Sequence, residues 1–342
     1  MQGKKELLAQ CLAAGRITPL VSHLRSLFAN DLQILAYHRV WDVSDDVGFS
    51  HDVELISASV EDFGWQLQHV QQNFTPITFE TLGRIIDGRE RCPRRPILIT
   101  FDDGYEDNFE IVFPILHASG IPAKMFLSTD YIGTDRTFWF DHLAHLLLTT
   151  HRTTVFVGTL GVTLELGDVA SRRKAIRTVL SQLKRIPNDR RLAVIDELDA
   201  ALDGDSDHSA TFDSRPMTWE QVRKMAAHGI EIGSHTVTHP ILANVDDATL
   251  TFELCESKRA IERQINRPVS AISYPVGGKS AADDRVFAAV RDAGYRFEAT
   301  YLPGTNSFST PNHLALRRLH VERYTDRAYF SAMLNMPAVF GC

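Results

Sequence analysis

The stretch ILITFDDGYEDNFE, Ile97–Glu110, holds the clearest strand pattern of the chain and its most unusual pair of charges. An apolar run stops abruptly at two adjacent carboxylates, Asp102 and Asp103, and a glycine and a tyrosine follow. A short continuous apolar run of this kind predicts a strand buried on both faces, as in a parallel sheet. Two like charges at the end of such a strand repel each other, so they need a compensating partner.

Similar apolar runs recur along the chain and alternate with amphipathic helical patterns. The helical patterns have recognisable ends, such as Ser59, the capping-box pair Thr218 and Gln221, and the stop signals Gly120 and Gly294. We expect strands at Leu32–Val40, Ile97–Phe101, Ala123–Ser128, Ile230–Ser234, Val269–Ser273, Arg296–Tyr301 and Ala315–Val321. This alternation predicts an α/β fold with a parallel sheet. Seven strands favour a barrel, complete or not, over an open sheet, and no GxGxxG follows the first strand.

One segment, residues 133–215, departs from this alternation. Thr153–Leu166 has the pattern of a hairpin, and Ala175–Ile186 and Leu192–Leu202 have the pattern of two helices. Residues 204–214 look like a polar loop. We therefore expect an α+β insertion between two barrel units. It could be a lid or a wall of the substrate site, or an elaboration of the surface, and the pattern does not separate these roles.

The composition is that of an ordinary globular protein. The chain has 342 residues, 44% hydrophobic and 23% charged, which allows a barrel over 31–342 after an N-terminal helical segment, 1–30. A net charge of −7 gives no support for nucleic-acid binding. The four cysteines are far apart, so neither a disulfide framework nor a thiolate zinc site is expected. The oligomeric state stays open.

No targeting or membrane-spanning segment is expected. The first lysines are not followed by an apolar stretch of roughly 7–15 residues, which argues against a signal peptide. No run reaches the length of about 18 apolar residues that a transmembrane helix needs. Both observations predict a cytoplasmic protein. Pro19–Phe28 could form an amphipathic helix that docks onto the protein or, less favoured, makes a peripheral membrane contact.

The stretch GIEIGSHTVTHP, Gly229–Pro240, contains the second group of chemically active residues. His235 and His239 lie four positions apart just after a predicted strand, and imidazoles at this spacing can bind one cation. In a chain with 14 histidines such a pair alone is a modest signal. Asp103 strengthens it, because two histidines and one carboxylate leave an open position for water, as in catalytic zinc sites.

The two aspartates would then have separate roles. Asp103 would bind the metal, and Asp102 would stay unligated and take a proton from the attacking water. The alternative is structural, with an aspartate capping the helix expected over Glu106–His117. The positions favour the catalytic interpretation, since His38, His235 and the pair Tyr274-Pro275 also lie near the ends of strands. In a parallel barrel these ends form the active-site face.

The motifs resemble those of the polysaccharide deacetylases, the family-four carbohydrate esterases that share the NodB homology domain. TFDDGY, Thr100–Tyr105, resembles the first motif, and SHTVTH, Ser234–His239, resembles the second. SYPVGG, Ser273–Gly278, resembles the third, and LRRLHVER, Leu316–Arg323, lies in the place of the last. The first two motifs, in this order and about 130 residues apart, are highly specific. LAYHRV, Leu35–Val40, is closest to the exopolysaccharide-biosynthesis branch.

The resemblance covers Leu32 to Val321 without the insertion, and it implies a fold and an activity. The fold is a distorted (β/α)7 barrel, in agreement with the seven expected strands. The activity is metal-dependent hydrolysis of an N-acyl group, most simply N-acetyl, on an amino sugar. The substrate would be a poly- or oligosaccharide or a lipid-linked glycan precursor, and the expected cytoplasmic location favours a precursor. Zinc suits the ligands best, and cobalt, nickel or iron would also fit.

The resemblance also assigns roles to individual residues. Asp102 corresponds to the catalytic base. Asp103, His235 and His239 correspond to the metal ligands. The backbone N–H of Tyr105 would help hold the oxyanion, and His320 is the candidate that protonates the leaving amine. Tyr274 and Pro275 are expected near the substrate. His38 could also line the substrate site, although a hydrogen bond in the core is slightly favoured for it.

The third motif departs from the family pattern. Ser273 and Val276 stand where the family usually has an arginine and a tyrosine, and that arginine orients the catalytic carboxylate. Arg317 or Arg318 could substitute for it. The departure keeps two alternatives open: a non-catalytic carbohydrate-binding protein on a degenerate barrel, and a hydrolase of linear or cyclic non-sugar amides. TFWFDHL, Thr137–Leu143, could stack on sugar faces or anchor the insertion.

Overall fold

The computed structural model describes residues 2–15, 21, 25, 31–42, 49, 51–202, 214–308 and 315–341. The amphipathic segment Pro19–Phe28 and the polar loop 204–214 lie almost entirely outside these described residues.

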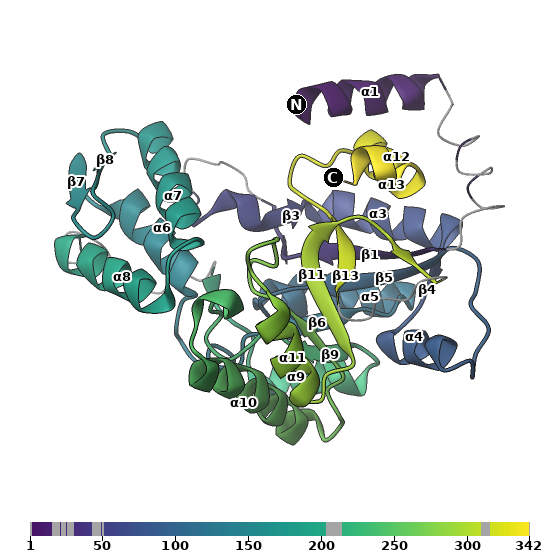
Figure 1. Cartoon of the computed structure of the whole chain (residues 1–342). Helices are drawn as coiled ribbons and strands as arrows, with labels where there is room; N and C mark the ends of the chain where they lie inside the picture. The colour runs from purple at the N-terminus through teal and green to yellow at the C-terminus, as the bar shows by residue number, and fades with distance from the viewer. Residues whose placement is uncertain are drawn as a thin grey trace.

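Seven parallel strands close into a barrel, and their order around the barrel follows their order in the chain (Figure 1). The strands are β1 (Asp31–Tyr37), β5 (Pro96–Phe101), β6 (Lys124–Leu127), β9 (Glu231–Ser234), β10 (Ala271–Ser273), β11 (Phe297–Pro303) and β13 (Leu316–His320). β1 pairs with both β5 and β13, which closes the ring. A register shift between β11 and β13 distorts it. The predicted distorted (β/α)7 barrel is confirmed, and each strand overlaps one of the seven predicted stretches.

Three short strands, β3, β4 and β12, were not predicted, and the predicted strand Leu32–Val40 is divided at His38 into β1 and β2 (Arg39–Val40). β2 and β3 (Ile56–Ala58) form a small parallel sheet of their own. β4 (Thr75–Pro76) runs beside β5, and β12 (Asn306–Ser307) pairs antiparallel with β1. Strands of two or three residues are too short for an alternating pattern to be recognised in the sequence.

Helices cover the outside of the barrel, and their ends match the predicted signals. Ser59 accepts a hydrogen bond from the Asp62 N–H, and Thr218 and Gln221 form the expected capping box. Gly120 ends its helix with φ of 66°. The helices are α3 (Val60–Asn73), α4 (Phe79–Ile86), the π-helical turn η2 (Asn108–Val112), α5 (Phe113–Ser119), α9 (Trp219–Ala227), α10 (Asp247–Ile265), α11 (Asp284–Asp292), α12 (Arg327–Asn335) and α13 (Pro337–Phe340). At the N-terminus, α1 (Gln2–Ala14) lies against α12 (Figure 1).

Side chains that point into the barrel change character along the strands. Side chains alternate between the two faces of a strand, so Leu98, Thr100 and the strand-end residue Asp102 share one face. Leu98 belongs to the apolar cluster that Phe126 and Phe297 also join. The polar residues therefore gather at the carboxyl ends of the strands, above this apolar cluster.

The insertion between β6 and α9 forms a lobe beside the barrel (Figure 1). The predicted hairpin and both predicted helices are confirmed, whereas the first helix of the lobe was not predicted. The lobe consists of α6 (Trp139–Thr149), β7 (Thr154–Val157), β8 (Val162–Glu165), α7 (Val169–Leu183) and α8 (Asn188–Leu202). Its buried side chains form one cluster, which also includes Tyr105 and Tyr131 from the barrel loops. The lobe is therefore packed onto the barrel through those loops.

Two further findings concern the described residues. None of their helices is both long and apolar enough to cross a membrane. Cys11, Cys92 and Cys255 are free thiols, as their spacing predicted.

Candidate active site

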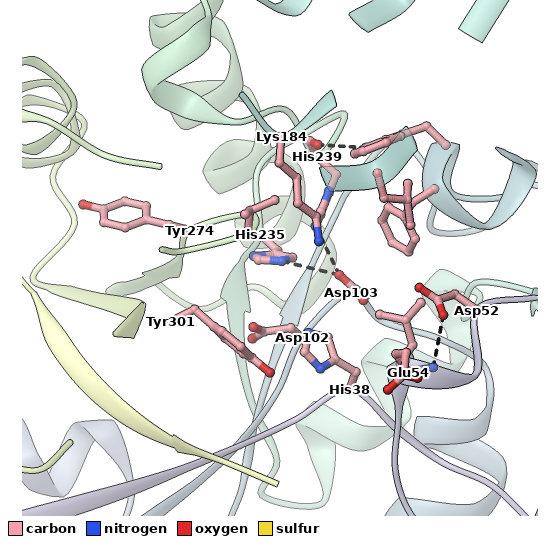
Figure 2. Close-up of a pocket in the computed structure, with 15 residues that line it drawn as sticks. His38, Asp52, Glu54, Asp102, Asp103, Lys184, His235, His239, Tyr274 and Tyr301 are labelled. Carbon is pink, nitrogen blue, oxygen red and sulfur yellow. Dashed lines mark hydrogen bonds and ion pairs between the residues drawn. The ribbon is translucent and has the colours of Figure 1, made fainter. Parts of the chain in front are cut away.

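Three buried side chains from two loops converge at the carboxyl ends of the strands (Figure 2). Asp103 follows β5, and His235 and His239 follow β9. The Oδ1 atom of Asp103 lies 3.4 Å from Nε2 of His235 and 3.3 Å from Nε2 of His239. The sequence predicted this trio, and the structure brings all three residues together.

The spacing of these donors suits a shared metal ion. Separations of 3.3–3.4 Å exceed the usual hydrogen-bond distance between nitrogen and oxygen. Two ligand atoms at about 2.0–2.1 Å from zinc, at a tetrahedral angle, lie about 3.3 Å from each other. The set of two imidazoles and one carboxylate is also one that zinc prefers, so the residues present fit a metal.

The protonation of the two imidazoles depends on their surroundings. Burial lowers the pKa of His239 to about 4, so its ring is neutral and can bind a cation. Burial has the same tendency at His235, but the charges of Asp102 and Asp103 outweigh it and raise the pKa of that ring. A cation that binds here would favour the neutral form of both rings.

The loop after β9 that carries His235 and His239 is held in place by neighbouring elements. Nδ1 of His235 lies 2.8 Å from the Ser273 carbonyl oxygen, which directs its Nε2 toward Asp103. Glu253, on α10, accepts hydrogen bonds from the backbone N–H groups of Val237 and Thr238 at 2.6 and 2.9 Å. Glu253 carried no recognisable signal in the sequence, since it is one of several carboxylates on an amphipathic helix.

The backbone at the site adopts left-handed conformations that non-glycine residues usually avoid. The φ angles are 76° at Asp103, 70° at Thr236, 58° at His239 and 64° at Val276. Each such residue costs about 1–3 kcal/mol, and such strain concentrates at functional sites. At Gly104, with φ of 96°, a side chain would be strained, and its Cβ would lie 2.8 Å from Cδ2 of Leu127, which would have to move.

Asp102 points into the barrel and has a different set of partners. Its carboxylate accepts hydrogen bonds from Arg318 at 2.9 and 2.7 Å and from the Ser273 hydroxyl at 3.1 Å. Burial by itself would raise the pKa of Asp102, but the Arg318 guanidinium outweighs it and lowers the pKa below its ordinary value. Asp102 therefore stays ionised at neutral pH.

The alternative role of these aspartates as helix caps is not supported. The side-chain partners of Asp102 and Asp103 are the arginine and the histidines named above, not helix N–H groups. The Glu106 N–H donates instead to the Arg215 carbonyl, and the N–H groups of Asn108 and Phe109 donate to the carbonyls of the preceding turn.

Arg318 supplies the positive charge that the third motif lacks. Its side chain is fully buried on β13, and besides Asp102 it donates to the Thr300 carbonyl at 2.7 Å and to the Ser273 hydroxyl at 3.0 Å. Of the two arginines that the sequence offered, Arg317 faces outward and donates to the Pro303 carbonyl. Ser273 stands where the family usually has its arginine, and its hydroxyl lies between Arg318 and Asp102 and is hydrogen-bonded to both.

Tyr105 connects the first motif to the insertion. Its hydroxyl donates to the Asp141 carboxylate at 2.5 Å, and both residues are completely buried. Its backbone N–H has no acceptor among the described residues, whereas the N–H groups of Gly104 and Glu106 on either side are bonded to backbone carbonyls. Tyr105 is not among the residues that line the cavity described below, so its predicted role in holding the oxyanion stays a prediction.

A cavity opens above the metal ligands, and its walls come from three parts of the chain. The loop before β3 contributes Asp52, Glu54 and Leu55, none of which carried a sequence signal. The insertion contributes apolar and aromatic side chains and one lysine, so it forms a wall of this cavity. The lining residues are His38, Asp52, Glu54, Leu55, Asp102, Asp103, Trp139, Phe140, Leu180, Lys184, His235, His239, Tyr274, Val276 and Tyr301.

The two candidate histidines on β1 and β13 lie in different places. His38 lines the cavity near Asp102 (Figure 2), although a position in the core was the slightly favoured expectation. His320 is not among the lining residues. Its ring stacks on that of Tyr301, with ring centres 3.5 Å apart, and Tyr301 itself lines the cavity. Burial and the charge of Arg318 lower the pKa of His320 to about 3. Neither observation favours His320 as the proton donor, and that role stays a prediction.

The two residues of the third motif that were expected near the substrate differ in position. Tyr274 lines the cavity, although its hydroxyl points away from the metal ligands in Figure 2 and donates to Glu298. Pro275 does not line the cavity, whereas Val276 does. The left-handed turn at Val276 rotates the chain after β10, which a period of two along the strand could not predict.

The burial of the Asp141 carboxyl group can be tested by measuring how the stability of the protein depends on pH. Burial raises its pKa to about 7, against the opposing charge of Arg39. The folded state then holds a proton that the unfolded state has lost, so this group lowers stability as pH rises from about 4 to 8. We expect Asp141→Asn, which cannot ionise, to gain roughly 2–4 kcal/mol of unfolding free energy relative to wild type over that interval. Urea unfolding of the variant and of wild type at both pH values measures this gain. If the difference in unfolding free energy between the two proteins is the same at both pH values, the carboxyl group of Asp141 is not buried as the structure shows.

Comparisons with known proteins agree with this geometry. A family profile described as "Polysaccharide deacetylase" matches residues 89–297. The Bacillus subtilis (strain 168) protein YxkH, whose name places it among the polysaccharide deacetylases, is 24% identical over 246 residues. The match covers 72% of this chain and 57% of YxkH, so the chain spans little more than half the length of that relative.

Solved structures share the fold. The Streptococcus pyogenes deacetylase PplD, described in complex with acetate, has a TM-score of 0.56 and 18% identity, covering 86% of this chain and 94% of PplD. IcaB from Ammonifex degensii has a TM-score of 0.55 and 16% identity, covering 90% and 98% of the two chains. At these identities the likeness concerns the fold.

Proposed function

Because this chain belongs to the polysaccharide deacetylase family, we propose that it is a metal-dependent hydrolase that removes an N-acyl group, most simply N-acetyl, from an amino sugar. One observation carries the proposal: two adjacent buried aspartates have different partners. Asp103 faces two imidazoles, and Asp102 faces a guanidinium. A protein that only binds sugars could use a metal ion to hold its ligand. It would not need a second, ionised carboxylate beside the metal ligands, because it abstracts no proton.

Asp103, His235 and His239 would hold the metal, for which zinc is the best match. Cobalt, nickel and iron accept similar donors. When bound, the cation polarises the acyl carbonyl and lowers the pKa of a water molecule.

The residues of the chain would perform the proton transfers and hold the developing charge. Asp102, kept ionised by Arg318, would take a proton from the attacking water. The free Tyr105 N–H would donate to the oxyanion that forms from the acyl carbonyl. His38 replaces His320 as the candidate that gives a proton to the leaving amine, because His38 lies on the cavity wall.

The alternatives are weaker in view of the structure. The hypothesis of a non-catalytic binder arose from the missing arginine of the third motif, and Arg318 fills that role. No contact favours a non-sugar amide as substrate. The acetate described with the Streptococcus pyogenes relative is the product that N-acetyl hydrolysis would release here.

We expect zinc to stabilise the protein through His239. At a zinc concentration of about 100 times the dissociation constant, binding adds about 2.7 kcal/mol to the stability. Thermal unfolding of protein treated with chelator, with and without zinc, measures this effect. His239→Ala should abolish the shift, whereas His228→Ala should keep it, since His228 is exposed and lies at the end of α9. A zinc shift that persists in His239→Ala would place the metal elsewhere.

A substrate panel tests the sugar part of the proposal. We expect kcat/KM on N-acetylated amino-sugar oligomers to exceed that on simple linear and cyclic amides by at least about 100-fold, because contacts remote from the reacting bond contribute to catalysis. If a non-sugar amide is the better substrate, the sugar assignment is wrong although the chemistry at the metal stands.

A further inference from the structure

The first turn of α6 contacts the candidate ligand His239 at two points and Tyr105 of the first motif at a third. The Trp139 indole N–H donates to the His239 carbonyl at 3.1 Å. The Phe140 ring lies 5.1 Å from the His239 ring, measured between centres. Asp141 accepts the hydrogen bond from the Tyr105 hydroxyl. These residues belong to the insertion, so the insertion does more than cover the barrel.

The Tyr105 ring has two further close neighbours besides Asp141. The Arg39 guanidinium lies 4.3 Å from the centre of the ring and forms a buried ion pair with Asp107. The centre of the Phe138 ring lies 4.7 Å from that of Tyr105. Because Tyr105 and Asp141 are both completely buried, the phenol cannot rotate to another acceptor without opening the cluster.

The position of the phenol controls a backbone group that the proposed reaction needs. Tyr105 is two residues after Asp103, and its own N–H has no acceptor among the described residues. The flanking residues Gly104 and Glu106 pair with the segment at Arg215 and Met217. The backbone of Tyr105 is thus fixed by this pairing on one side and by its side chain on the other.

We propose that Asp141 is a positioning residue for the reaction: through the phenol of Tyr105, it fixes the Tyr105 N–H where the oxyanion forms. The inference rests on the proposed function and extends it, because it makes the insertion a part of the catalytic apparatus. Asp141 touches neither substrate nor metal ligands, and it acts only through Tyr105.

Removal of the Asp141 carboxylate should lower kcat more than it changes KM. A lost oxyanion donor lowers kcat by about 10²–10³-fold, and a displaced donor by less. We expect Asp141→Ala to lower kcat by about 10- to 100-fold and to change KM by less than about threefold, since the other cavity walls bind the ground state. Asp141→Asn keeps an acceptor oxygen and should recover most of the loss.

Tyr105→Phe removes the other half of the same contact. It should lower kcat as Asp141→Ala does, and the double variant should be no slower than either single variant, because both act through one hydrogen bond. Losses that multiply in the double variant would show that Asp141 acts by another route.

Asp199→Asn is the matched control. It weakens the contact between the Asp199 carboxylate and Nε2 of His142, whose atoms lie 2.6 Å apart. His142 follows Asp141 directly on α6, so this contact lies within the same insertion. This variant should keep the kcat and KM of wild type. If it loses as much activity as Asp141→Ala, the effect comes from general loosening of the insertion and the positioning role is wrong.

A readout independent of activity separates this inference from the proposed function. Amide hydrogen exchange of the segment 102–108 should be faster in Asp141→Ala than in wild type, and unchanged in Asp199→Asn. Equal exchange in all three proteins, or a kcat of Asp141→Ala within twofold of wild type, would overturn the positioning role. If wild type hydrolyses no N-acylated amino sugar, the proposed function fails, and the exchange result then decides the positioning role alone.

Discussion

Asp102→Asn is expected to lower kcat by about 10²–10⁴-fold while the variant still binds its metal. The asparagine has nearly the shape of the aspartate, but it cannot accept the proton of the attacking water. Asp103, His235 and His239 are untouched, so the zinc-induced rise in melting temperature should persist. The measurement combines kcat, the metal content per chain and the zinc shift for wild type and variant.

The substitution also leaves the buried Arg318 without its negative partner, so a fall in stability must be separated from a chemical effect. Kinetics measured well below the melting temperature of the variant, on protein with full metal content, make this separation. Turnover within about tenfold of wild type under those conditions would show that Asp102 is not the base.

Arg318→Met is expected to lower the free energy of unfolding by about 3–5 kcal/mol, the usual effect of removing one partner from a buried ion pair. The charge of Asp102 would remain buried with only the Ser273 hydroxyl as a donor. Arg317→Met is the matched control: the neighbouring arginine is exposed and forms no ion pair with Asp102, so the change should stay within about 0.5 kcal/mol. Urea unfolding of the three proteins measures these differences.

The stability of Arg318→Met should change with pH in a direction that differs from that of wild type. In wild type the folded-state pKa of Asp102 is below its ordinary value, so its stabilising contribution is present above about pH 4 and disappears as pH falls through the folded-state value. In Arg318→Met burial should raise that pKa, so the variant should lose further stability as pH rises above about 4. A loss below about 1 kcal/mol, or the same pH slope as wild type, would contradict a buried ion pair.

A double variant provides an internal check of the ion pair. Asp102→Asn combined with Arg318→Met removes both charges, so it should be more stable than Arg318→Met alone. It should remain inactive, because the base is absent. If the two destabilising effects simply add, the residues do not interact as the structure shows.

The barrel could be predicted because its strands are apolar on both faces and end at strong turn signals. The trio Asp103, His235 and His239 could be predicted for a related reason. Two of its members are four residues apart, and all three follow strands whose carboxyl ends meet in a parallel barrel. Features that depend on one strand or one turn were therefore accessible to sequence reasoning.

Features that depend on how distant elements meet were not accessible. The side-chain period of β13 puts Arg318 and Arg317 on opposite faces, but only the register with the neighbouring strands shows that Arg318 reaches Asp102. The choice between His38 and His320 depends on Tyr301, which stacks on His320 and lines the cavity itself. No local pattern contains this information.

The insertion shows the same limit. Its hairpin and two of its helices follow from their own periodicity, but its function depends on a single turn at the start of α6. That turn places Trp139, Phe140 and Asp141 against residues about 35–100 positions away in the sequence. The segment around Trp139 anchors the insertion and also lines the cavity, so stacking of Trp139 or Phe140 on a sugar stays a prediction.

The proposed activity is hydrolysis of an N-acetyl group on an amino sugar, at a site that holds a metal ion. The most direct measurement quantifies acetate and free amine released from an N-acetylated glucosamine oligomer by the zinc-loaded protein and by protein treated with chelator. We predict equal amounts of acetate and amine with zinc, and neither after chelation. Folded protein that holds one zinc ion per chain at Asp103, His235 and His239, and still releases no acetate from any such oligomer, would contradict the claim.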